Sequence, residues 1–324
     1  MNPRGKVVVT GGAGFIGSNL CRVLARSGRT DVVVVDDLST GRRRNLDGVP
    51  VEVHEVSILD GALPALCAGA SAIVHLAAVP SVPRSIADPR RSHDVNVTGT
   101  LEVLDAARAV GAHVVLASSS SVYGHNPTLP KTEDMVCRPA SPYAVSKLAA
   151  ESYALAYGSC YGTPCTAFRF FNVFGPGQPP DHDYAAVVPA FVAAALRGDP
   201  LVVHGDGEQS RDFTFVDSVT DVLTRVVEHR TSSPTPVNLA FGTRTTLNEL
   251  IAVLGGLLGR RLDVEHRPPR AGDVRHSQAD TAALRRLVPG AAPVPLEIGL
   301  RRTIEWLEKR ATPTATTAAP LGAR

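Results

Sequence analysis

Short apolar runs alternate with longer amphipathic stretches through the first half of the chain. Five of these runs are rich in Val and Ile and are bounded by turn-forming residues, which predicts β-strands over residues 7–10, 31–35, 51–53, 72–76 and 113–118. Helices are predicted over residues 16–27 and 91–110, because each stretch ends in front of a glycine, Gly28 or Gly111. Strands that are apolar on both faces and alternate with helices indicate an α/β fold with a doubly wound parallel sheet.

The pattern changes at about residue 169. Segments dense in Pro and Gly (GPGQPPDHD and RGDPLVVHGDGEQ) separate shorter elements from there on. We therefore expect residues 1–168 to form one domain and residues 169–310 a smaller α/β domain that covers the C-terminal edge of the sheet and partly returns to it. Residues 311–324 are rich in Pro, Thr and Ala without periodicity, which predicts a disordered tail.

Composition narrows the class of protein. Of the 324 residues, 44% are apolar and 20% are charged, which suits a packed globular core. The net charge of +2 offers no general attraction for nucleic acid or for an anionic membrane. There is no membrane-spanning run of about eighteen apolar residues, the five cysteines contain no C-x-x-C, and the ten histidines have no metal-ligand spacing. We expect a cytoplasmic protein with no metal, no nucleic-acid partner and no membrane partner.

A glycine-rich segment follows the first predicted strand. Residues 6–18 read KVVVTGGAGFIGS, a strand followed by Gly11-x-x-Gly14-x-x-Gly17 and the start of a helix. Glycines at this spacing allow a tight turn and a close approach of the backbone to a pyrophosphate at the helix N-terminus. Asp36 lies nineteen residues after Gly17, where a carboxylate binds the adenosine ribose hydroxyls. These features predict a Rossmann-type dinucleotide-binding domain.

The acidic residue also discriminates between two cofactors. A carboxylate at the ribose repels a 2′-phosphate, so Asp36 favours NAD over NADP. Three consecutive arginines, Arg42, Arg43 and Arg44, argue the other way, because they lie close enough in the chain to clamp a phosphate. Such runs are more often solvated loops, and we therefore predict NAD as the cofactor.

A second constellation lies near the middle of the chain. In the segment SPYAVSK, Ser141 suits a helix N-cap and Pro142 the first helical position, so Tyr143 and Lys147 share one helix face. An ammonium group beside a phenol, together with the positive nicotinamide of NAD⁺, is expected to lower the tyrosine pKa from about 10 toward 7, which makes Tyr143 a general base. A serine cluster (ASSSSVYG) follows the fifth predicted strand, at the edge where catalytic groups are expected.

These motifs together resemble a known family. TGGAGFIGS, DDLSTG, HLAA, ASSSSVYG, YAVSK, RFFNVFGPGQ and GDGEQSRDF occur in this order over residues 6–310. The chain resembles the extended short-chain dehydrogenase/reductases, in the branch of the NAD-dependent nucleotide-sugar epimerases and dehydratases. The resemblance implies a tightly held NAD, a UDP-sugar substrate and a homodimer.

The resemblance also implies roles for individual residues. Ser119, Tyr143 and Lys147 match the catalytic residues of the family. Implied cofactor contacts are Gly11, Gly14, Phe15, Ile16, Gly17, Asp36, Asp37, Ser39, Thr40, Gly41, Ser57, Ile58, Leu76, Ala77, Ala78, Asn96, Tyr143, Lys147 and Phe171. Implied substrate contacts are Ser119, Ser120, Ser121, Tyr143, Asn172, Val187, Val188, Arg211, Arg270, Asp273 and Ser277.

Two positions depart from the family pattern in an informative way. Ser57 stands where the family usually has an aspartate that meets the adenine amine, and a serine accepts that hydrogen bond more weakly. Dehydratases that resemble this chain carry Asp and Glu where Ser120 and Ser121 stand, and serines are neither strong acids nor strong bases. The second departure favours C4 epimerisation over dehydration.

The substrate is inferred from the later part of the chain. The segment GPGQPPDHDYAAVVPAF resembles epimerases that act on UDP-N-acetylglucosamine as well as UDP-glucose. Ser277 matches a gate position that is bulky in enzymes restricted to the plain hexose, so a serine leaves space for an N-acetyl group. The alternatives are a UDP-glucuronate 4-epimerase, although Pro179 and its neighbours replace an arginine for the carboxylate, then a 4,6-dehydratase, then an inactive NAD-binding regulator.

Overall fold

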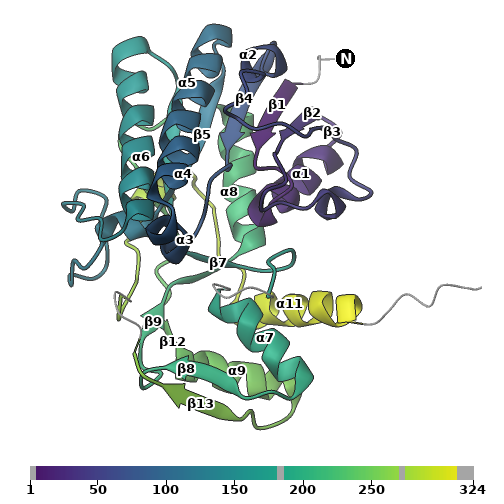
Figure 1. The fold of residues 1–324 in the computed structure, drawn as a ribbon, viewed down its shortest axis with the longest axis vertical. Helices are drawn as coiled ribbons and strands as arrows, with labels where there is room; N and C mark the ends of the chain where they lie inside the picture. Colours follow the sequence, from purple (N-terminus) through teal and green to yellow (C-terminus); the bar gives the residue numbers. More distant parts are fainter. Residues whose placement is uncertain (1–4, 181–185, 270–273, 312–324) are drawn as a thin grey trace, which may run out of the picture.

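A seven-stranded parallel sheet forms the centre of the protein (Figure 1). The computed structural model describes residues 5–180, 186–269 and 274–311. The strand order is β11-β6-β5-β4-β1-β2-β3. The chain therefore adds β2 and β3 on one side of β1, and then β4, β5 and β6 on the other side. The strands span Gly5–Thr10 (β1), Thr30–Val35 (β2), Glu52–His54 (β3), Ala70–His75 (β4), His113–Ser119 (β5), Cys165–Phe170 (β6) and Val237–Leu239 (β11). The doubly wound parallel sheet expected from the sequence is confirmed.

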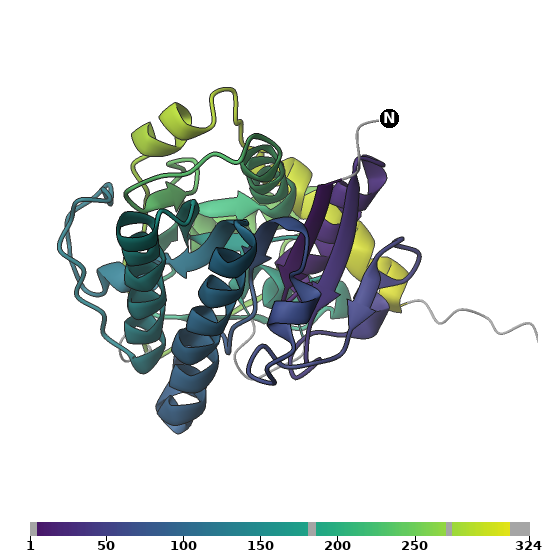
Figure 2. The same ribbon diagram turned by 90° about the horizontal axis from the view of Figure 1, so that it is seen from above.

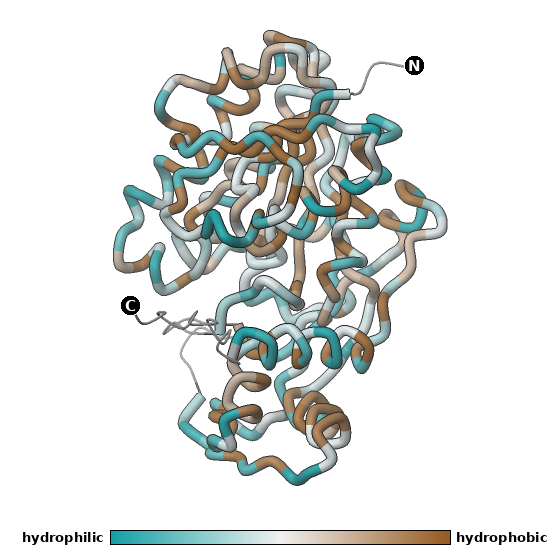
Figure 3. The backbone as a smooth tube through the Cα atoms, turned by 90° about the vertical axis from the view of Figure 1, so that its right-hand side faces the viewer, coloured by the Kyte–Doolittle hydropathy of each residue, from teal (hydrophilic) through white to brown (hydrophobic). Residues whose placement is uncertain are grey.

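Helices cover both faces of this sheet, as Figure 2 shows from above. One face packs against α1 (Phe15–Arg26) and α8 (Val216–His229) through a core that includes Leu20 and Leu223, both fully buried. The other face packs against α2 (Leu63–Leu66), α5 (Gly99–Val110) and α6 (Pro142–Tyr161). Two apolar faces explain why the strands lack an alternating pattern of polar residues. Figure 3 shows hydrophobic segments running through the body of the fold.

The helix predicted over residues 91–110 is divided in the structure. It consists of α4 (Pro89–His93), a π-helical turn (Asp94–Thr98) and α5, which ends in front of Gly111 in the left-handed conformation. A π-helical turn adds a residue to the helix and changes the direction in which its side chains point. Here it directs Asn96, which is buried, toward the loop after β4.

A second group of elements lies beyond the C-terminal ends of the strands (Figure 1). Its core contains Phe174, Val192, Phe215, Leu254 and Leu300, all nearly inaccessible to solvent. Its elements are β7 (Asn172–Phe174), α7 (Val187–Arg197), β8 (Leu201–His204), β9 (Ser210–Arg211), β10 (Phe213–Phe215), β12 (Thr245–Thr246), α9 (Leu247–Leu258), β13 (Val264–Arg267) and α11 (Leu296–Ala311). The strand β11 belongs to the main sheet and the helix α8 packs against it, although both lie between β10 and β12 in the sequence.

Four short helices complete the connections: η1 (Arg43–Leu46), α3 (Val82–Ala87), η3 (Ser120–Tyr123) and α10 (Ala282–Leu287). Residues 312–324, predicted as a tail, lie outside the described residues, and α11 extends through Ala311. Within the described ranges, no helix is long and apolar enough to cross a membrane. The same ranges contain no group of three His, Cys, Asp or Glu side chains arranged for a metal ion.

Candidate active site

The glycine-rich turn between β1 and α1 has no room for side chains. Gly11 has a φ of +71°, and a Cβ on it would lie 2.6 Å from the backbone nitrogen of Ala77. A Cβ on Gly17 would lie 2.2 Å from the carbonyl oxygen of Gly11. The backbone of the turn therefore lies directly against the start of α1, which leaves the helix N-terminus open to a phosphate.

Asp36 is held at the end of β2 by two backbone amides. Its Oδ2 accepts a hydrogen bond from Ala13 N at 2.8 Å, and its Oδ1 accepts one from Leu38 N at 2.9 Å. Burial raises the pKa of this carboxyl, and the two amides oppose that shift. Gly41 packs against the same carboxylate, because a Cβ there would lie 2.7 Å from Oδ1. The carboxylate is thus fixed between the glycine turn and the loop after β2.

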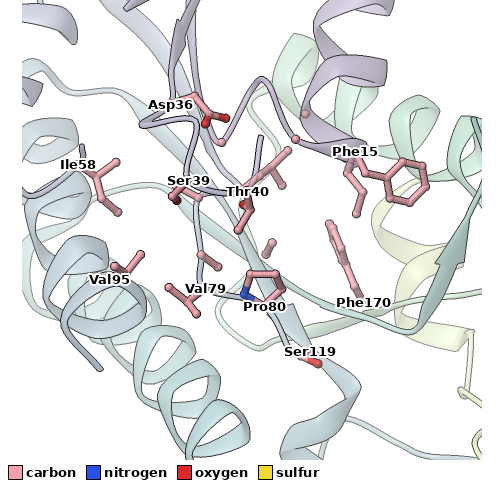
Figure 4. Close-up of a pocket in the computed structure, with 18 of the residues that line it drawn as sticks. Phe15, Asp36, Ser39, Thr40, Ile58, Val79, Pro80, Val95, Ser119 and Phe170 are labelled. Carbon is pink, nitrogen blue, oxygen red and sulfur yellow. The ribbon is translucent and has the colours of Figure 1, made fainter. Parts of the chain in front are cut away.

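A pocket of about 350 Å³ lies along the C-terminal ends of β1, β2, β4 and β5. Figure 4 shows Asp36 at one end of it and Ser119 at the other. Of the expected cofactor contacts, those that line it are Gly11, Gly14, Phe15, Ile16, Gly17, Asp36, Asp37, Ser39, Thr40, Ser57, Ile58, Leu76, Ala77, Ala78, Tyr143, Lys147 and Phe171. The pocket therefore connects the carboxylate expected to bind the ribose with the residues expected to be catalytic.

Sequence reasoning missed several residues of the lining. They are Val35, Val56, Val79, Pro80, Val95, Ala117, Ser118, Phe170, Val173 and Gln178. Most of them adjoin a residue that the motifs did identify, and Gln178 belongs to the RFFNVFGPGQ segment. Their position next to motif residues could have indicated that they line the pocket. Apolar residues such as Val79 and Pro80, however, have no chemical group that identifies them as site residues.

Asn96 supports the pocket from behind. Its Oδ1 accepts a hydrogen bond from Val79 N at 2.8 Å, and its Nδ2 donates to Val79 O at 3.2 Å and to Ser146 Oγ at 3.0 Å. The amide thereby ties the wall formed by Val79 and Pro80 to helix α6. Its expected contact with the cofactor stays a prediction, because it does not line the pocket itself.

Helix α6 begins as its sequence predicts. Pro142 is the first helical residue, and Ser141 Oγ accepts a hydrogen bond from Ala144 N at 3.2 Å. The side chains of Tyr143, Lys147 and Ser119 all line the pocket, and the nearby Ser119 hydroxyl lowers the Tyr143 pKa. The structure therefore brings together the three residues expected to be catalytic.

The lysine is bound to the end of β5. Its Nζ donates to the carbonyl oxygen of Ala117 at 2.9 Å, and burial lowers the Lys147 pKa to about 8. Nearby His75 lies between Thr10, at 2.7 Å, and Thr100, at 3.1 Å. Burial and the Lys147 charge lower the His75 pKa to about 3, so this histidine is neutral and structural.

The serines after β5 form a small network. Ser119 Oγ accepts hydrogen bonds from Ser121 Oγ at 2.9 Å and from Ser121 N at 3.2 Å. Ser118 Oγ donates to the Glu151 carboxylate at 2.6 Å, and that carboxylate pairs with Arg169 at 2.6 Å. Strand β5, helix α6 and strand β6 are therefore joined next to Ser119, the serine expected to be catalytic.

The expected substrate contacts lie mostly in the second group of elements. Arg211 donates from Nη1 to Ser210 O at 3.0 Å, and Ser277 N donates to the same carbonyl oxygen at 3.0 Å, so the two residues lie side by side. Asn172 begins β7, while Val187 and Val188 begin α7. Ser120 starts η3 beside Ser119. Arg270 and Asp273 lie outside the described residues.

Comparison with known proteins identifies the family. Residues 7–240 match the family described as the NAD dependent epimerase/dehydratase family. The chain belongs to this family. It is 38% identical over 313 residues to the UDP-glucose 4-epimerase of Mycolicibacterium smegmatis, covering 94% of this chain and 99% of that protein. The chain is therefore an NAD-dependent enzyme, and NAD is its cofactor.

Two solved structures show the range of chemistry among relatives of this enzyme. The UDP-N-acetylglucosamine 4-epimerase of Methanobrevibacter ruminantium M1, in complex with UDP-N-acetylmuramic acid, superposes with a TM-score of 0.91 at 35% identity, covering 95% and 99% of the two chains. The NAD-dependent NDP-hexosamine 5,6-dehydratase TunA superposes with a TM-score of 0.86 at 35% identity, covering 95% and 99%. Epimerases and a dehydratase thus share this fold, so the site residues must decide the reaction.

The residues present fit NAD. The close-packed glycines leave bare backbone at the start of α1, and the fixed Asp36 carboxylate lies where ribose hydroxyls bind. Among Arg42, Arg43 and Arg44, none lines this pocket, so the basic run does not oppose the assignment. When bound, NAD⁺ supplies a hydride acceptor and a positive charge.

Two influences act on the Tyr143 pKa in the fold. Burial is the larger and raises the pKa, and the Ser119 hydroxyl lowers it in part. The Lys147 ammonium is held at Ala117 O and is not among the groups that shift the phenol. The lowered pKa expected for Tyr143 includes the positive charge of bound NAD⁺ and stays a prediction.

Proposed function

We propose that the chain is a UDP-sugar 4-epimerase that interconverts UDP-N-acetylglucosamine with UDP-N-acetylgalactosamine and UDP-glucose with UDP-galactose. The observation that carries the proposal is the pair of Ser119 and Tyr143 at the far end of the pocket from Asp36, followed by hydroxyls at Ser120 and Ser121. A 4,6-dehydratase must also remove the C5 proton and protonate the C6 hydroxyl, and serines at these two positions are neither strong acids nor strong bases.

The side chains suit proton transfer at the O4 hydroxyl of the sugar. In the proposed mechanism Tyr143 accepts the O4 proton as C4 is oxidised to the ketone, and it returns the proton after the 4-keto sugar has turned over. Ser121 Oγ donates a hydrogen bond to Ser119 Oγ, and the Ser119 hydroxyl lowers the Tyr143 pKa, so in the proposed mechanism these hydroxyls help to stabilise the phenolate. Lys147 holds the end of β5 in place through Ala117.

Two observations support the breadth of substrate. Ser277 is a half-buried residue beside Arg211, and its side chain is small, as a site that accepts an acetamide group requires. The relatives with high similarity are named for UDP-glucose in one case and for UDP-N-acetylglucosamine in the other.

A panel of UDP-sugars tests the proposal. Purified enzyme is incubated separately with UDP-N-acetylglucosamine, UDP-glucose and UDP-glucuronate, and the products are resolved by NMR. We expect the C4 epimers of the first two sugars. Turnover of UDP-glucuronate alone would overturn the substrate, and a 4-keto-6-deoxy product would overturn the reaction.

Two further features of the enzyme follow from the resemblance and stay predictions. We expect a homodimer, which sedimentation velocity measures directly as roughly twice the 34.1 kDa of one chain. We also expect a cytoplasmic location, which cell fractionation tests.

A further inference from the structure

A second cavity, of about 530 Å³, lies where α1, η1 and α11 meet. In Figures 1 and 2 the last turns of α11 lie close to α1 and to the loop after β2. The lining residues are Ser18, Asn19, Arg22, Arg44, Asn45, Asp47, Pro176, Gly177, Trp306, Lys309 and Arg310. None of them lines the cofactor pocket, so the two cavities are separate among the described residues.

The charge of this cavity is strongly unbalanced. Four cationic side chains line it, Arg22, Arg44, Lys309 and Arg310, against one carboxylate, Asp47. The whole chain has a net charge of only +2, so this excess is local. A concave site lined by one sign of charge attracts ions of the other sign.

The cavity also accounts for the basic run after β2. The sequence raised the possibility that Arg42, Arg43 and Arg44 clamp the phosphate of NADP. In the structure Arg44 lines the second cavity, whereas Arg42 and Arg43 line neither cavity. Of these three arginines, Arg44 therefore lines the second cavity and not the pocket expected to hold the cofactor.

The walls of the cavity are held by hydrogen bonds. Arg22 Nη2 donates to Asn45 O at 2.9 Å, and Asn45 Nδ2 donates to Ala13 O at 2.8 Å. Asn19 Nδ2 donates to Phe15 O at 2.9 Å and to Pro176 O at 2.8 Å. A site whose walls are fixed before binding loses less conformational entropy when a ligand arrives.

We propose that this cavity binds a polyphosphate anion, such as pyrophosphate or the phosphates of a nucleotide. Guanidinium groups bind phosphate oxygens in pairs, and several cations at one site match a ligand with several negative charges. The volume falls in the usual range for small-ligand sites. Trp306 adds a flat indole surface, already in contact with the Arg310 guanidinium at 4.8 Å, on which a nucleobase can stack.

Trp306 makes the proposal directly testable, because it is the single tryptophan of the chain. The NAD-loaded enzyme is first saturated with UDP, and its tryptophan fluorescence is then titrated with inorganic pyrophosphate. Calorimetry on the same samples gives the affinity. We expect a saturable change of Trp306 fluorescence in the wild type.

Two charge reversals distinguish a site from general attraction. Arg44→Glu and Arg43→Glu change the net charge equally at neighbouring exposed positions, but Arg44 alone lines the cavity. We expect Arg44→Glu to weaken pyrophosphate binding at least tenfold and Arg43→Glu to change it less than twofold. An unsaturable titration in the wild type, or equal losses in both variants, would overturn the proposal.

Two arms separate the sources of the anion. If the ligand is a nucleotide, ADP binds more tightly than pyrophosphate, and Trp306→Leu removes that advantage while pyrophosphate binding remains. If it is inorganic polyphosphate, ADP has no advantage. Either result supports the polyphosphate site. Because neither Arg43 nor Arg44 lines the cofactor pocket, the outcome does not depend on which UDP-sugar the enzyme converts.

Discussion

The buried ion pair behind the catalytic serine provides the sharpest test of how the site is held together. Glu151 on α6 is 2% exposed and Arg169 on β6 is 3% exposed. Arg169 Nη2 donates to Glu151 Oε1 at 2.6 Å and Arg169 Nε donates to Oε2 at 3.0 Å. Ser118 Oγ donates to Oε2 at 2.6 Å. The perturbation is Glu151→Leu, which removes the carboxylate and keeps an apolar side chain of similar length.

The expected loss of stability follows from these contacts. The substitution leaves the Arg169 guanidinium buried without its counterion and Ser118 without its acceptor. Removing one partner of a buried pair costs about 3–5 kcal/mol, which is roughly two to four orders of magnitude in the folding equilibrium. Arg169 keeps its position over the Tyr123 ring at 4.8 Å and its bond to Glu133 O at 3.1 Å, so we expect the lower half of that range.

The assay is urea unfolding followed by circular dichroism, with two matched controls. Asp221→Leu breaks the ion pair with Arg225, in which both side chains are about 40% exposed to solvent. This variant is expected to lose less than about 1 kcal/mol of the free energy of unfolding. The double variant Glu151→Leu/Arg169→Met removes both charges and is expected to be more stable than Glu151→Leu alone. If Glu151→Leu costs no more than Asp221→Leu, or if the double variant is the less stable of the two, the reasoning is refuted.

Three further predictions concern the catalytic residues and the substrate. Tyr143→Phe is expected to abolish turnover while nucleotide-sugar binding, measured by calorimetry, survives, since the ring still fills the space; activity above a few per cent would mean that another group takes the O4 proton. The Lys147 pKa is about 8 in the folded protein, below its value of 10.5 in the unfolded chain. Between these two pKa values the unfolded chain binds more protons than the folded protein, so the free energy of unfolding rises with pH. The stability of wild type relative to Lys147→Met is therefore expected to increase by up to about 3 kcal/mol from pH 8 to pH 10.5, and a flat difference in urea unfolding contradicts the burial argument. Ser277→Tyr is expected to lower kcat/KM for UDP-N-acetylglucosamine by about ten- to a hundredfold, because overfilling a packed site costs about 1–3 kcal/mol, and to spare UDP-glucose; equal losses for both substrates would show that residue 277 is not a gate.

The sequence alone determined the features that depend on neighbours in the chain. Apolar runs predicted five of the seven strands of the main sheet, β1 to β5, to within one or two residues at each end, but not β6 or β11. The glycine spacing predicted a turn in which Gly11 and Gly17 leave no room for a Cβ. The N-cap of α6 was predicted from Ser141 and Pro142, and the four-residue spacing placed Tyr143 and Lys147 in one pocket. These features are local, because capping, turn geometry and helical periodicity act over a few residues.

Only the tertiary structure decided what depends on burial and on contacts between distant segments. No spacing rule connects Glu151 with Arg169, or Asn96 with the loop after β4. The same holds for Arg44, which lines one cavity with residues of α1 and α11. The burial of Tyr143 is the clearest case: its neighbour Lys147 was visible in the sequence, but the loss of water that raises the phenol pKa was not. Burial is a property of the packed chain as a whole, and no local pattern reports it.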